Sequence, residues 1–205
     1  MRVFDRRIFL TALVASGLPA GARAAADPAV LDPVRALIGA LLTIMKQGKA
    51  APFASRVGTL APVVDRSFDL EAILRASVGA GFSGLEPAKL QALRVAFRDY
   101  TVASYVHSFD NFAGQRFDVQ PDTRTVAGGE QIVMTKIVAA DGDAHELDYV
   151  MHAQGGAWRV VDVLADGSVS RVAVQRSDFR RLLSQGGATA LIDSLQAKAK
   201  DLATP

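Results

Sequence analysis

Residues 145–170 read HELDYVMHAQGGAWRVVDVLADGSVS, and this stretch decides the fold class. It holds two runs rich in β-branched and aromatic residues, 145–154 and 158–166, separated by Gly155-Gly156. A glycine pair between two such runs is typical of a tight hairpin, and Asp166-Gly167 provides a further turn after the second run. Strands joined by short turns are antiparallel neighbours, so the stretch predicts part of an antiparallel meander.

The first of these runs alternates in side-chain character. Leu147, Tyr149 and Met151 are predicted to lie on one face of the sheet, and the polar residues between them on the other. One face is therefore expected to meet water and the other to be covered.

The neighbouring sequence extends the sheet in both directions. Segments 115–121, 130–140 and 168–176 have the same strand character, and Asp141-Gly142 predicts another hairpin. We expect four to five strands in all.

Helical patterns flank the strands and supply the cover. Apolar spacing, capping residues and helix-ending glycines predict helices at 32–48, 52–64, 69–79, about 87–109, 178–185 and 190–200. This order predicts an α+β domain with about six helices packed on one face of the meander. An apolar interior between these layers is expected, either as a packed core or as a cavity.

The N-terminus reads as an export signal. MRVFDRRIFLTALVASGLPAGARAAA has a basic start, a short apolar run and a small-x-small site, so we expect cleavage after Ala24 and a single domain over 27–203. Arg6-Arg7-Ile8-Phe9-Leu10 resembles the twin-arginine motif, and the general secretory route is the alternative. Both routes lead to the periplasm.

Charge and cysteine content exclude several classes of protein. The chain has a formal charge of +2, and removing residues 1–24 takes away four basic residues and one acidic residue, which leaves −1. No basic surplus then remains for nucleic acid. The absence of cysteine excludes thiolate catalysis, cysteine-bound metals and an acylated anchor.

Catalytic and metal-binding patterns are missing from the sequence. The three histidines lack zinc-site spacing, and Asp141, Asp143 and Glu146 are explained by hairpin turn chemistry. If the protein were an enzyme, His107 with Tyr105 and Asp110 would be the first candidate for an acid-base catalytic group. We therefore expect no enzyme activity, no metal and no cofactor.

Several motifs agree with one known family in order and spacing. They are Phe68-Asp69 opening a helix that ends at Gly79, Tyr100 and Tyr105, Trp158-Arg159-Val160-Val161-Asp162-Val163, Gly167-Ser168-Val169-Ser170, and Arg176-Ser177-Asp178-Phe179. Over about residues 30–200 the chain resembles the MlaC-type periplasmic lipid-binding proteins, the toluene-tolerance auxiliary family. Segments 109–117 and 172–180 are most similar to the hopanoid-associated HpnM subgroup. Gly79-Ala80-Gly81-Phe82 departs from the family's usual Gly-x-x-Trp.

The resemblance implies a monomeric carrier that moves a phospholipid or a hopanoid-type lipid through the periplasm. Its implied partners are an inner-membrane ABC transporter complex and an outer-membrane lipoprotein complex. The alternatives are a protein-binding adaptor with a solid core and, less favoured, an enzyme acting on a lipid.

A lipid cavity is then expected between the covered sheet face and the helices. Tyr105 and Tyr149 are expected at its mouth, because a phenol can bury its ring and keep its hydroxyl in water. The predicted lining residues are Phe68, Ile73, Phe97, Tyr100, Tyr105, Phe109, Phe112, Val133, Ile137, Leu147, Tyr149, Met151, Val161 and Val163.

Overall fold

The computed structural model describes residues 27–204, so the predicted signal peptide lies outside the described residues. The helical half contains α1 (Pro28–Gln47), α2 (Phe53–Ser67), α3 (Leu70–Val78), the 3-10 helix η1 (Gly79–Gly84) and α4 (Pro87–Ser108). It is followed by β1 (Arg116–Thr125), the 3-10 helix η2 (Ala127–Gly129), β2 (Gln131–Val138), β3 (Ala144–Gln154), β4 (Ala157–Ala165), β5 (Val169–Ser170) and α5 (Arg171–Leu202).

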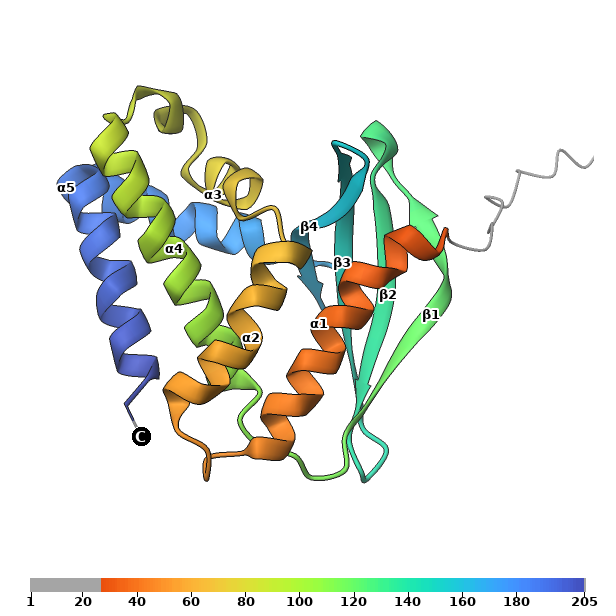
Figure 1. The fold of residues 1–205 in the computed structure, drawn as a ribbon. Helices are drawn as coiled ribbons and strands as arrows, with labels where there is room; N and C mark the ends of the chain where they lie inside the picture. Colours follow the sequence, from red (N-terminus) through yellow and green to blue (C-terminus); the bar gives the residue numbers. More distant parts are fainter. Residues whose placement is uncertain (1–26, 205) are drawn as a thin grey trace, which may run out of the picture.

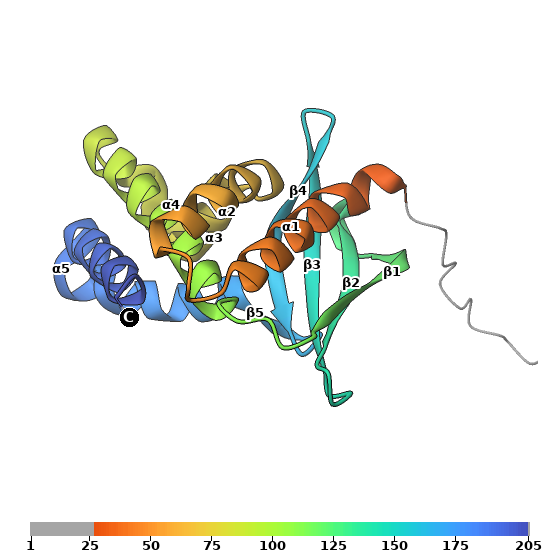
Figure 2. The same ribbon diagram turned by 60° about the horizontal axis from the view of Figure 1, so that its bottom comes forward.

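The five strands form one antiparallel sheet in the order β1-β2-β3-β4-β5. Helix α1 lies across this sheet, and the other helices gather beside its β4 side (Figure 1). Figure 2 shows the described helices on the same side of the sheet. The predicted α+β fold with an antiparallel meander is confirmed.

The covered face of the sheet is built from a cross-strand row of apolar side chains. Val133 pairs with Tyr149, and Tyr149 pairs with Val163 on the next strand. All three side chains are buried, together with Met151 and Val160. The core therefore sits between this row and α1.

A β-bulge in β4 determines which residues join that face. Val150 pairs with Asp162 but Met151 pairs with Val160, so Val161 is an extra residue without a partner on β3. The extra residue shifts the alternation by one, which turns both Val160 and Val163 inward.

Helix α1 begins earlier than its sequence pattern predicts. We expected Asp32-Pro33 to open it, but the helix starts at Pro28, where the Asp27 side chain accepts a hydrogen bond from the Ala29 N–H at 3.0 Å. Burial of Val30 and Leu31 stabilises this first turn despite Pro33 inside the helix. Of the helices in residues 27–204, α1 alone is long and apolar enough to cross a membrane, and eight of its residues are buried in the fold.

The segment 171–176 is helical, so its prediction as part of a strand was wrong. Strand β5 is only two residues long, and Ser170 caps α5 by accepting a hydrogen bond from the Ala173 N–H at 2.9 Å. The predicted start of this helix at Ser177-Asp178 was therefore also wrong. The predicted break at Gly186-Gly187 is confirmed, because Gly187 has a φ of 64°, which divides α5 into two helical segments.

Candidate functional site

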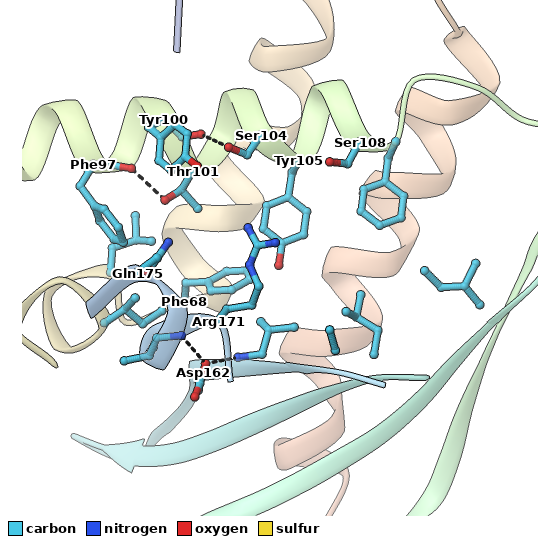
Figure 3. Close-up of a pocket in the computed structure, with 18 residues that line it drawn as sticks. Phe68, Phe97, Tyr100, Thr101, Ser104, Tyr105, Ser108, Asp162, Arg171 and Gln175 are labelled. Atoms are coloured by element: carbon cyan, nitrogen blue, oxygen red, sulfur yellow. Dashed lines mark hydrogen bonds between the residues drawn. The ribbon is translucent and has the colours of Figure 1, made fainter. Parts of the chain in front are cut away.

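A cavity of about 270 Å³ lies between α4, the first turns of α5, the start of α3 and one end of the sheet. Figure 3 shows its wall, in which aromatic and aliphatic side chains predominate. The lining residues are Phe68, Leu70, Ile73, Phe97, Tyr100, Thr101, Ser104, Tyr105, Ser108, Phe109, Ile137, Leu147, Asp162, Val163, Ala165, Arg171, Val172 and Gln175.

A chain of aromatic rings forms the α4 side of the wall. Tyr105 and Phe109 are one helical turn apart and stack at 6.0 Å between ring centroids, while Phe68 meets the Tyr105 ring edge-on at 5.7 Å. Phe68 is held in place because the next residue, Asp69, donates its backbone N–H to the Val160 carbonyl at 2.9 Å. Such aromatic contacts stabilise the wall beyond the burial of the rings.

Two hydroxyl groups in the wall, those of Thr101 and Ser104, form hydrogen bonds within α4. Thr101 donates to the Phe97 carbonyl at 2.8 Å and Ser104 to the Tyr100 carbonyl at 2.7 Å. Figure 3 shows both bonds along α4. The hydrogens of these two hydroxyls are therefore already used within the helix.

Two charged residues, Asp162 and Arg171, complete the wall. The Asp162 carboxylate accepts hydrogen bonds from the Val172 N–H at 3.0 Å and from the Ser170 hydroxyl. Burial raises the pKa of Tyr105, and the nearby positive charge of Arg171 acts in the opposite direction. The Tyr105 phenol thus stays protonated at neutral pH and retains a hydrogen to donate.

Nine of the fourteen predicted lining residues surround this cavity. They are Phe68, Ile73, Phe97, Tyr100, Tyr105, Phe109, Ile137, Leu147 and Val163. The strand residues among them lie at one end of the sheet, where Leu147 of β3 pairs with Ala165 of β4, and the helical residues face that end.

Three other predicted residues, Val133, Tyr149 and Met151, lie in the solid core. Each is fully buried, at the part of the sheet that α1 covers. Tyr149 is therefore not at a mouth: its hydroxyl has no hydrogen-bond partner within residues 27–204, and burial raises its pKa well above 10. Alternation along a strand identifies the covered face but does not tell which part of that face a helix fills.

The remaining two predicted residues lie outside the cavity for local reasons. Val161 is the extra residue of the β4 bulge and does not line the wall. Phe112 follows α4 and is 38% exposed, with the Lys46 ammonium 5.5 Å from its ring centroid.

Half of the wall was not predicted from the sequence. Thr101, Ser104 and Ser108 follow Phe97 at helical spacing on α4, a periodicity that could have indicated them. Arg171, Val172 and Gln175 had no such signal while their segment was read as a strand. Within residues 27–204 no group of three or more His, Asp or Glu side chains could hold a metal ion.

The fold and this site define an α+β protein with an internal aromatic and aliphatic cavity, the kind of interior that suits an apolar ligand. The family model described as MlaC protein matches residues 35–197. The chain belongs to the MlaC family.

A solved structure has the same fold. It is described as the phospholipid-binding protein from Ralstonia solanacearum in complex with a phospholipid. The TM-score is 0.69 at 20% sequence identity, and the match covers 85% of this chain and 99% of that chain.

Proposed function

We propose that this protein is a periplasmic lipid carrier that holds the acyl chains of a phospholipid in the cavity. The observation that carries the proposal is the aromatic and aliphatic lining between α4, α5 and the sheet. Membership of the MlaC family and the fold shared with the Ralstonia solanacearum protein support it.

The energetics of the ligand explain why such a cavity is needed. Burying an acyl chain is worth about 0.8 kcal/mol per methylene, so a sixteen-carbon chain costs on the order of 12 kcal/mol to expose to water. A carrier must therefore offer an interior nearly as apolar as a bilayer, without binding so tightly that release stops.

The cavity must also change size during loading. Its volume of about 270 Å³ is slightly below the roughly 300–1,000 Å³ of sites for drug-sized ligands. A two-chain lipid therefore requires the walls of the cavity to move apart.

In this proposal the carrier, released by cleavage after Ala24, shuttles lipid between an outer-membrane lipoprotein complex and an inner-membrane ABC transporter. It performs no reaction on the lipid. A hopanoid is the second candidate cargo, favoured by the similarity of segments 109–117 and 172–180 to the hopanoid-associated subgroup.

The test is native mass spectrometry of the mature protein purified from a lipid-containing host, followed by organic extraction. Co-purified phospholipid or hopanoid at up to one molecule per chain is the expected result. Protein that carries no lipid and takes up none from vesicles would favour a protein-binding adaptor, and a chemically altered lipid would indicate an enzyme.

A further inference from the structure

Arg171 places a positive charge at the wall of the cavity without a partner for it. Figure 3 shows its guanidinium beside Tyr105, among the residues that line the cavity. In the described part of the chain, no carboxylate oxygen lies within 4.0 Å of its nitrogens, and the guanidinium donates no hydrogen bond. The side chain is exposed, so the guanidinium stands in water at the rim of the cavity, where the charged headgroup of a lipid would lie when its acyl chains are inside.

The carboxylate that shares the wall does not fill that role. Asp162 directs its oxygens to the backbone N–H groups of Val163 and Val172, at 2.7 and 3.0 Å, and to the Ser170 hydroxyl. The Asp162 carboxylate thus binds two backbone N–H groups and a hydroxyl, and the Arg171 guanidinium is not among its partners. The charge of Arg171 is thus left for a ligand.

Arg171 also stands where helix electrostatics disfavour a cation. It is the first residue of α5, and the N-terminal end of a helix carries a partial positive charge that attracts anions and repels cations. The N–H groups of Val172 and Ala173 are already bonded to Asp162 and Ser170. The position of Arg171 therefore adds nothing to helix stability, whereas its charge could pair with a bound anion.

We propose that Arg171 binds the phosphate diester of the lipid headgroup, so that the carrier selects glycerophospholipids over neutral lipids. The inference rests on the proposed function and makes it more specific. The protonated Tyr105 hydroxyl, beside the guanidinium, can donate a second hydrogen bond to the same phosphate. A neutral polycyclic hydrocarbon would leave the guanidinium unpaired, so the inference disfavours an uncharged hopanoid as cargo.

The same anionic chemistry occurs in the carboxylate of a free fatty acid, and the experiment separates the two. Delipidated mature protein is incubated with vesicles containing equal amounts of phosphatidylglycerol and diacylglycerol with the same acyl chains, or separately with palmitate. Native mass spectrometry then counts each bound lipid. The variants are Arg171→Gln, Arg171→Lys and, as the matched control, Arg180→Gln, an exposed arginine on the same helix that does not line the cavity.

We expect wild type and Arg180→Gln to prefer phosphatidylglycerol, and Arg171→Gln to lose about tenfold of that preference because one charge-assisted hydrogen-bond pair is gone. Arg171→Lys should recover part of it, since it keeps the charge but not the forked geometry. The thermal unfolding midpoint of Arg171→Gln should be no lower than that of wild type, which excludes loss of folding as the cause.

The outcomes are distinct for the two proposals. Three results overturn the role of Arg171 and leave the carrier function standing. They are an unchanged preference in Arg171→Gln, an equal loss of preference in Arg180→Gln, and a wild type that takes up both lipids equally. Uptake of palmitate without phospholipid overturns the choice of phosphate. A wild type that takes up no lipid at all overturns the proposed carrier function.

Discussion

The carboxylate of Asp162 on β4 accepts a hydrogen bond from the backbone N–H of Val172 on α5, with 3.0 Å between the two heavy atoms. The Ser170 hydroxyl donates to the same carboxylate. One side chain of the sheet therefore fixes the first turn of α5, and with it the residues of α5 that line the cavity. Asp162 does for Val172 what a helix N-cap does for its own helix.

We predict that Asp162→Ala loosens this connection. Val172 and Ser170 would lose their acceptor, and the free energy of unfolding should fall by about 1–2 kcal/mol, the range found for lost helix caps and buried hydrogen bonds. Hydrogen exchange of amides 172–175 should accelerate more than that of α4. Asp178→Ala, an exposed position on the same helix, is the control and should change neither quantity. Equal exchange in wild type and Asp162→Ala would contradict the prediction.

The sequence predicted the sheet well because its signals are local. Hairpin glycines and the alternation through Leu147, Tyr149 and Met151 correctly identified an antiparallel meander with one covered face. These features depend on neighbours two residues apart, which a strand pattern records directly.

The parts that were mispredicted depend on contacts between distant segments. Val161 became a bulge residue, although no turn residue marks the position. Segment 171–176 has a strand-like pattern of valines, but the caps from Ser170 and Asp162 make it helical. The division of the covered face between α1 and the cavity follows from where α1 crosses the sheet, which periodicity does not encode.

A second prediction concerns the buried hydroxyl of Tyr149. Among residues 27–204 this hydroxyl has no hydrogen-bond partner, and a buried unsatisfied group costs about 1–3 kcal/mol. Tyr149→Phe should therefore raise the free energy of unfolding by about 1 kcal/mol in urea titrations. Tyr105→Phe, which changes a phenol of the cavity wall, should have a smaller effect on stability. A loss of stability in Tyr149→Phe would mean that the hydroxyl binds a partner such as a buried water.

A third prediction tests whether the cavity is where lipid binds. Ala165 on β4 lines the wall, so Ala165→Phe would place a ring inside the cavity and should reduce bound lipid per chain at least severalfold. Ala157→Phe adds the same ring at an exposed position of the same strand and should leave lipid binding unchanged. Lipid is counted by native mass spectrometry, with circular dichroism to verify folding. Full lipid occupancy in folded Ala165→Phe would place the ligand elsewhere.

The fourth prediction uses the ion pair that connects α3 to α4. Arg94 donates two hydrogen bonds of 2.7 Å to the Glu71 carboxylate, and this pair lowers the pKa of Glu71 below its usual value of 4.5. An acid whose pKa is lower in the folded protein stabilises the fold above its unfolded pKa, and the contribution disappears as pH falls through the folded pKa.

Glu71→Gln should therefore unfold at lower urea concentration than wild type near pH 7. The difference should begin to shrink as the pH falls below about 4.5 and disappear in stronger acid, where wild-type Glu71 is protonated too. Asp193→Asn, which removes an exposed carboxylate away from the ends of α5, should follow wild type throughout. A Glu71→Gln deficit that stays constant across this pH range would show that the lost stability comes from packing of the side chain, and the ion pair would then have no measurable part in joining α3 to α4.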